Sequence, residues 1–243
     1  MAGHSKWAQI KRKKAKTDAA RGKLFTKLAR EIIVAAREGG GDPEGNARLK
    51  VAIQRAKEAN IPNDNIARAI QKGVGNLEGS AYEELFYEGY GPGGVAVLVH
   101  GLTDNRNRTS AHVRHLFSKY GGNLGEAGCV AWQFQSRGVI IVDRGTSSIS
   151  EDEMTLVALD AGAEDMVTTE DAFELTTAPE DLNSVREALT ENGIEAAEAE
   201  IAMVPQAVIS VGPEEAEKVM RLVEMLEEHD DVQDVYTNLD PGE

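Results

Sequence analysis

Residues 139–204 read VIIVDRGTSSISEDEMTLVALDAGAEDMVTTEDAFELTTAPEDLNSVREALTENGIEAAEAEIAMV, and the order of strands and helices that they predict indicates the fold class. Short β-branched or apolar runs predict strands, and longer segments with apolar residues three or four apart predict helices. The expected strands are 139–142, 166–169, 173–176 and 199–204, and the expected helices are 151–161 and 179–192. The resulting order, β-α-β-β-α-β, is that of a ferredoxin-like domain.

The segments on either side predict a second unit of similar kind. Before the stretch we expect strands at 84–90, 95–100 and 130–135 around a helix at 109–120, and after it a strand at 207–211, a helix at 213–228 and a strand at 234–237. Together they spell β-β-α-β and β-α-β, a related α+β domain with one extra strand. The simplest topology places the domain 137–204 as an insertion within a domain made of 79–136 and 205–243.

Residues 1–78 predict a third domain, a basic helical bundle. Helices are expected at 23–38, at 46–60, and from 63 or 64 to 73, because glycines and Pro62 end the apolar periodicity between them. The first 20 residues lack that periodicity and predict an extended or partly disordered arm. The predicted fold class is therefore α+β and multidomain: an N-terminal helical bundle followed by two ferredoxin-like α/β domains, one inserted in the other.

Two helices of this bundle carry cations on the side opposite the apolar one. In the helix 46–60, Arg48 and Arg55 are expected to point outward. In the helix 23–38, a narrow cationic arc is interrupted only by Val34. Its members are Lys23, Lys27, Arg30 and Arg37.

Charge is strongly segregated along the chain. The 243 residues hold 26 Lys and Arg against 41 Asp and Glu, a net charge of −15. Residues 1–75 hold 17 basic against 7 acidic residues, so the remainder carries −25. The first 30 residues alone contain ten basic residues and one acid. Such a confined cationic block predicts an anionic partner, and nucleic acid is the first candidate.

The cations of the first 30 residues are expected to contact phosphates. They are Lys6, Lys11, Arg12, Lys13, Lys14, Lys16, Arg21, Lys23, Lys27 and Arg30. Trp7 lies among them and either stacks on a base or anchors the arm on the bundle. A second basic patch, the only one in the acidic part of the chain, consists of Arg106, Arg108, Arg114 and Lys119. Of these, Arg106 and Arg108, at the start of the helix 109–120, are expected to form a second contact across the interdomain cleft.

Other function classes lack support in the sequence. Cys129 is the only cysteine, which excludes an intrachain disulfide and indicates a reducing compartment. No run approaches a membrane span, so no membrane partner is expected. No catalytic motif, cofactor or metal site is expected, and His112 and His115 are interpreted as surface histidines. The glycines of residues 89–94 match the dinucleotide-binding pattern G-x-G-x-x-G, which requires a helix directly after it. A strand is expected there instead, which indicates a hairpin turn.

Trp132 and Phe134 alternate on the expected strand 130–135. A sheet that stacks RNA bases has such aromatic residues, but so does a sheet packed beneath helices. No basic, glycine-containing aromatic motif accompanies them, so a core position is the preferred interpretation.

Five motifs resemble one family. They are GHSKW at 3–7, RGKLFTKL at 21–28, NIPNDNI at 60–66, YEGYGPGG at 87–94 and TDNRNRT at 103–109. Their sequences and order resemble the YebC/PmpR regulators, a family that includes the mitochondrial translational activator of cytochrome c oxidase. The resemblance implies a cytoplasmic three-domain protein, with a helical N-terminal domain and two α/β domains around a cleft. It implies either DNA-binding transcriptional regulation or a ribosome- or RNA-binding role that relieves stalled translation at proline-rich stretches.

The leading hypothesis is a nucleic-acid-binding regulator of gene expression and not an enzyme. Its partner would be DNA or ribosomal RNA, with the ribosome itself as a further candidate; a monomer is favoured, although the sequence does not fix the oligomeric state. The competing hypothesis is a ligand-sensing or protein-interaction module without nucleic-acid binding, in which the basic module docks on the acidic remainder of its own chain.

Overall fold

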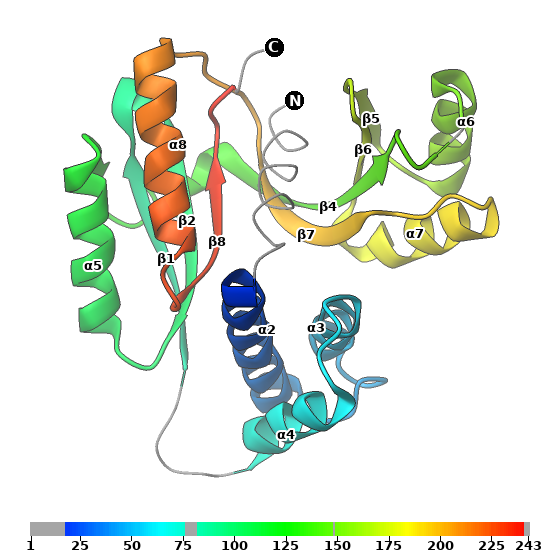
Figure 1. Cartoon of the computed structure of the whole chain (residues 1–243), viewed down its shortest axis with the longest axis horizontal. Helices are drawn as coiled ribbons and strands as arrows, with labels where there is room; N and C mark the ends of the chain where they lie inside the picture. The colour runs from blue at the N-terminus through cyan, green and yellow to red at the C-terminus, as the bar shows by residue number, and fades with distance from the viewer. Residues whose placement is uncertain (1–17, 76–81, 148, 241–243) are drawn as a thin grey trace.

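The computed structural model describes residues 18–75, 82–147 and 149–240, and Figure 1 shows three groups of elements. Helices α2, α3 and α4 form one group, a four-stranded sheet with α5 and α8 the second, and another four-stranded sheet with α6 and α7 the third. The predicted fold class is confirmed: a helical bundle precedes two ferredoxin-like α/β units, one of which interrupts the other.

The helical bundle consists of α2 (Asp18–Gly39), α3 (Ala47–Glu58) and α4 (Asn63–Val74). Helix α2 begins five residues before the predicted start at 23, so the last part of the expected arm is helical. Gly73 lets α4 approach α2 closely, since a Cβ there would lie 2.6 Å from the carbonyl oxygen of Ile33. The bundle core consists mainly of aliphatic side chains, among them Leu28, Ile32, Leu49, Ala52, Ile66 and Ala69.

The second group is an antiparallel sheet in the order β3-β1-β2-β8. Its elements are β1 (Glu83–Tyr90), β2 (Ala96–Thr103), α5 (Arg106–Lys119), β3 (Asn123–Leu124), α8 (Pro213–Glu227) and β8 (Val232–Thr237). Strands β1 and β2 form a hairpin, as the glycine-rich segment predicted. Gly93 and Gly94 in its turn have φ angles of 70° and 76°, which glycine adopts without strain. Helices α5 and α8 pack on the same apolar core.

The third group is the inserted sheet, in the order β5-β6-β4-β7. Its elements are β4 (Phe134–Asp143), α6 (Glu151–Ala161), β5 (Asp165–Thr168), β6 (Ala172–Thr177), α7 (Leu182–Glu191) and β7 (Glu198–Pro205). This is the predicted β-α-β-β-α-β unit. The two sheets share one spatial arrangement, in which β2, β3, β1 and β8 take the places of β4, β5, β6 and β7. The second group is thus a ferredoxin-like unit whose third strand comes first in the sequence.

The extra strand predicted for the second group is wrong. The segment Ala131–Gln133 is a 3-10 turn, and β4 then runs unbroken through the strand predicted at 139–142. The cause is Glu88, a buried carboxylate on β1 that accepts backbone N–H bonds from Gly128, Val130 and Ala131 at 2.7–2.8 Å. Amides held by this carboxylate do not pair with a strand. The strand predicted at 207–211 is reduced to one parallel bridge between Ile209 and Leu239.

Candidate nucleic-acid interface

The cationic side of α2 lies against the C-terminal end of α8 (Figure 1). Lys23 Nζ donates a hydrogen bond to the carbonyl oxygen of Glu228 at 3.2 Å, and Lys27 Nζ donates to that of Glu227 at 2.9 Å. The last carbonyls of an α-helix have no donor within the helix and carry partial negative charge. Two residues predicted to contact phosphate therefore cap α8 in this structure.

Arg30, the next residue of the same arc, is held more tightly. Its guanidinium donates to the Asp231 carboxylate at 2.8 Å and to the backbone carbonyl of Asp230. It also lies over the ring of Tyr82, with Cζ 5.3 Å from the ring centroid. The arginine therefore joins the bundle to the loop between α8 and β8.

Asp231 is the centre of this contact. Its side chain is 3% exposed, and one carboxylate oxygen accepts from Arg108 at 2.8 Å, Thr109 at 2.7 Å and Thr103 at 3.1 Å. The other oxygen accepts from Arg30. Burial favours the neutral acid, but these hydrogen bonds outweigh burial and lower the pKa of Asp231 to about 2. The carboxylate is therefore ionised at neutral pH, and it connects α2 to α5 because residues of both helices donate hydrogen bonds to it.

Arg106 and Arg108 differ although they are two residues apart at the start of α5. Asn105 caps the helix by accepting from the backbone N–H of Arg108 at 3.0 Å. The guanidinium of Arg108 bonds both Asp104 and Asp231, at 2.9 and 2.8 Å. Arg106 is exposed and has no acidic partner among the described residues. Of the predicted second contact, only Arg106 keeps its charge unneutralised.

Val34 explains why the arc is not a solvent-facing surface. It lies four residues after Arg30 and seven after Lys27, on the same side of α2, and it is buried. Arg37, at the end of the arc, is exposed. The arc is thus an intramolecular interface over its first three cations.

Most of the predicted phosphate contacts precede this interface. Arg21 lies in α2, but its side chain is outside the described ones. The remaining predicted residues lie outside the described residues altogether: Lys6, Trp7, Lys11, Arg12, Lys13, Lys14 and Lys16.

Comparison with known proteins identifies the family. Residues 5–76 match the model of the TACO1/YebC N-terminal domain, and residues 82–239 match that of the TACO1/YebC second and third domain. The chain belongs to the TACO1/YebC family. The family resemblance inferred from the five sequence motifs is thereby confirmed.

Relatives of this TACO1/YebC chain are regulatory proteins by name. A probable transcriptional regulatory protein of Pelotomaculum thermopropionicum is 61% identical over 238 residues, which cover 98% of both chains. One from Desulforamulus reducens is 59% identical with the same coverage. The crystal structure of a conserved hypothetical protein from Aquifex aeolicus is 50% identical and superposes with a TM-score of 0.85 over 93% of both chains.

The TACO1/YebC chain has a second polar junction, between the bundle and the open face of the first sheet. His100 Nε2 lies 2.8 Å from Glu84, which also accepts from Arg48 of α3 at 2.8 Å. His100 Nδ1 lies 3.4 Å from Asp234. Burial opposes the charged imidazole, but the two carboxylates outweigh burial and raise the pKa of His100 to about 9. The hydrogen bond from His100, with that from Arg48, lowers the pKa of Glu84 to about 2.

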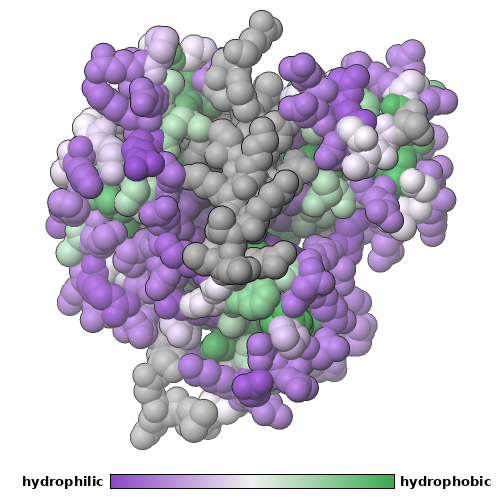
Figure 2. All heavy atoms as spheres, viewed as in Figure 1, coloured by the Kyte–Doolittle hydropathy of each residue, from purple (hydrophilic) through white to green (hydrophobic). Residues whose placement is uncertain are grey.

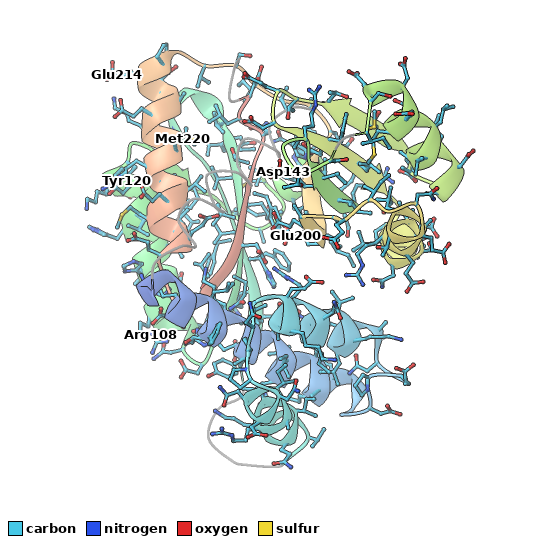
Figure 3. All side chains as sticks on the ribbon, turned by 45° about the vertical axis from the view of Figure 1, so that its right-hand side comes forward. Arg108, Tyr120, Asp143, Glu200, Glu214 and Met220 are labelled. Carbon is cyan, nitrogen blue, oxygen red and sulfur yellow. The ribbon has the colours of Figure 1, made fainter. Side chains whose placement is uncertain are left out.

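Arg55 connects the bundle to the inserted sheet. Its guanidinium bonds Glu31 of α2 at 3.3 Å and Glu200 of β7 at 3.2 Å; Glu200 is labelled in Figure 3. The prediction that Arg48 and Arg55 point outward is wrong, because both bridge to another part of the chain. Burial raises the pKa of Glu31 despite the opposing charge of Arg55. No sequence signal marked these pairs, since 145 positions separate Arg55 from Glu200.

The core position predicted for Trp132 is wrong. Phe134 is buried as expected, but Trp132 is 69% exposed, because it lies in the 3-10 turn instead of a strand. Its indole N–H donates to the carbonyl oxygen of Cys129 at 3.2 Å, an oxygen that also accepts from Tyr90 at 3.0 Å. The ring is therefore held in a fixed position at the surface.

Neither histidine of α5 belongs to a metal site in the described chain. His112 and His115 are exposed, and the ring of His112 lies 4.4 Å from that of His229, centroid to centroid. No group of three or more His, Cys, Asp or Glu residues suited to a metal ion is found among the described residues. Within the same residues, no helix has the length and apolar character needed to cross a membrane.

Proposed function

We propose that this chain is a nucleic-acid-binding regulator of gene expression that acts in the cytoplasm. The observation that carries the proposal is charge segregation: residues 1–75 hold 17 of the 26 basic residues and only 7 of the 41 acidic ones. Cations gathered in this way bind phosphates and release the counterions of a nucleic acid. Membership of a family with relatives named probable transcriptional regulatory proteins supports the same role.

We assign the main phosphate contacts to the basic residues before α2. Lys23, Lys27 and Arg30 donate hydrogen bonds within the chain, so they are available to phosphate only where the contact with α8 opens. Residues 1–78 would form the binding domain. The boundaries of the other two domains, 79–136 with 205–243 and 137–204, stay predictions.

The test uses the full chain and four substitutions in the cluster before α2: Lys11→Gln, Arg12→Gln, Lys13→Gln and Lys14→Gln. Affinity for a short DNA duplex and for a single-stranded RNA is measured by fluorescence anisotropy from 50 to 200 mM salt. For the unaltered chain, log K should fall with log salt by roughly 0.7–0.9 per phosphate contact. The variant should show a shallower slope, by about one for each cation that contacts a phosphate.

A matched control removes four cations of the two sheet domains that already bond carboxylates: Arg137→Gln, Arg186→Gln, Lys218→Gln and Arg221→Gln. It changes the net charge equally, and its salt slope should remain that of the unaltered chain. Failure of the unaltered chain to bind either nucleic acid at 50 mM salt would refute the proposal.

The two nucleic acids separate two roles. Tighter binding to duplex DNA, without co-sedimentation with ribosomes, favours transcriptional regulation. Tighter binding to RNA together with co-sedimentation favours a ribosome-associated role in translation.

A further inference from the structure

Helix α5 has an unusual charge for its place in the chain. Its 14 residues, RNRTSAHVRHLFSK, contain three arginines, one lysine and no acid. Residues 76–243 hold only nine basic residues against 34 acidic ones, and four of the nine are in this helix. A segment with a charge of +4 therefore lies within a part of the chain that carries −25.

Among the described residues, three cations of α5 have no ion pair or hydrogen bond to an acceptor, whereas the other basic residues of the two sheet domains do. Arg137, Arg186, Lys218 and Arg221 each bond a carboxylate, and Arg144 bonds the backbone carbonyl of Thr169. Arg108 is held by two aspartates. Within residues 82–147 and 149–240, the cations that neither pair with a carboxylate nor donate to a backbone carbonyl are Arg106, Arg114 and Lys119.

Each of the three unpaired cations is exposed: Arg106 at the first residue of α5, and Arg114 and Lys119 on the two flanks of its apolar stripe. Val113, Leu116 and Phe117 pack into the core beneath the helix. Helix α5 forms an outer edge of the molecule, and Figure 2 shows that the surface at this edge is largely hydrophilic. From Arg106 to Lys119 the helix spans roughly 20 Å at about 1.5 Å per residue, which is long enough for contacts to several phosphates.

The start of α5 adjoins the N-terminal module. Asp231 accepts from Arg30 of α2 and from Arg108 of α5, so one carboxylate fixes the distance between the two helices. Figure 3 shows Arg108 where α2 meets the α5–α8 layer. The basic residues before α2 join the chain at the end of α2 nearest α8, because Lys23 contacts Glu228.

We infer that the exposed face of α5, with Arg106, Arg114 and Lys119, is a second surface for the phosphate backbone of the nucleic acid that binds the N-terminal module. The inference rests on the proposed function. Arginine forks suit phosphate oxygens, and long cationic side chains spaced along one helix can reach successive phosphates of a polymer. Helix α8, which packs beside α5, holds five glutamates against one lysine and one arginine, and its net negative charge disfavours the polymer on that side of α5.

The experiment compares two full-length triple variants with the same change of charge. The first carries Arg106→Gln, Arg114→Gln and Lys119→Gln; the control carries Arg137→Gln, Lys218→Gln and Arg221→Gln, which removes cations that already have acidic partners. We expect the α5 variant to bind the duplex or RNA about tenfold more weakly at 50 mM salt, with a salt slope shallower by about two or three. The control should stay close to the unaltered chain.

A second measurement needs no variant. Acetylation of Lys119 is followed by mass spectrometry with and without nucleic acid, and Lys218, which bonds Glu214, is the internal reference. Protection of Lys119 alone supports the inference.

Three results would overturn it. One is equal binding by the two triple variants together with unprotected Lys119, while the variant in the cluster at 11–14 still loses affinity; the proposed function then stands without this surface. Another is binding of polyglutamate to the α5 face as tight as that of nucleic acid, which would make the face a site for acidic protein. The third is failure of the unaltered chain to bind nucleic acid, which refutes both proposals together.

Discussion

The cations of α2 and those of α5 have the same chemistry but different surroundings. Lys23, Lys27 and Arg30 point at helix carbonyls and a buried carboxylate, whereas Arg106 and Arg114 have no acidic partner among the described residues. The difference shows that local charge does not by itself define a binding surface. A cation is available to an external anion only if no acceptor of its own chain already binds it. By this criterion the unpaired cations of α5 are more available than the first three cations of the α2 arc.

Removal of the shared carboxylate should affect the docked region most. Asp231→Ala leaves Arg30, Arg108, Thr109 and Thr103 without their common acceptor. Loss of one partner from a buried ionic cluster costs about 3–5 kcal/mol. Urea unfolding of the variant should show that loss, while Asp230→Ala, at the exposed neighbouring position, should change the free energy of unfolding by less than about 0.5 kcal/mol. Equal stability of the two variants would mean that Asp231 does not hold α2 in place.

The junction at His100 should make stability depend on pH. The pKa of His100 is about 9 in the folded chain, compared with 6.5 for an unperturbed histidine such as that of the unfolded chain. The contribution of His100 to stability is therefore complete below pH 6.5 and is lost as pH rises through 9. A shift of this size corresponds to up to about 3 kcal/mol. Unfolding free energies at pH 6 and pH 9.5 should differ less for His100→Gln than for the unaltered chain. A variant with the same pH dependence would exclude His100 as its source.

The smallest of the expected effects on the free energy of unfolding is the difference between removing a docked arginine, Arg30, and removing a free one, Arg114. Arg30→Gln removes charged hydrogen bonds to Asp231 and to a backbone carbonyl, and should lower the free energy of unfolding by about 1.5–3 kcal/mol. Arg114→Gln removes no bond to an acid and should leave stability within about 0.5 kcal/mol. The order should reverse in the nucleic-acid assay, where Arg114→Gln is expected to weaken binding more. The same order in both assays would contradict the distinction between docked and free cations.

Periodicity predicted most of the fold, because most elements are amphipathic over their own length. The helix predicted at 151–161 and the strand at 84–90 are in place to within a residue. The strand predicted at 130–135 failed because Glu88, more than 40 positions earlier, takes the amides of that segment. A contact of this kind leaves no trace in local patterning.

The candidate site was less predictable than the fold. Cationic residues could be identified from composition, but their partners at 227–231 lie some 200 positions away. One signal was present: Val34 interrupts the cationic arc of α2, and an apolar residue in a supposed solvent-facing row indicates that the row is covered. The basic patch of α5 could be identified from the sequence, but which of its cations lack a partner could be recognised only from the ion pairs of the two sheets.

The position of β8 has a consequence for the order in which the protein is made. Strand β8 pairs with β2, and the acceptors of Lys23, Lys27 and Arg30 lie at the end of α8 and in the loop before β8, some 200 residues after α2. Domains fold from the N-terminus during synthesis. Until residues 227–231 are synthesised, each nascent copy therefore presents the α2 cations without these intramolecular acceptors, so the same helix is first an open cationic surface and only afterwards a docked one.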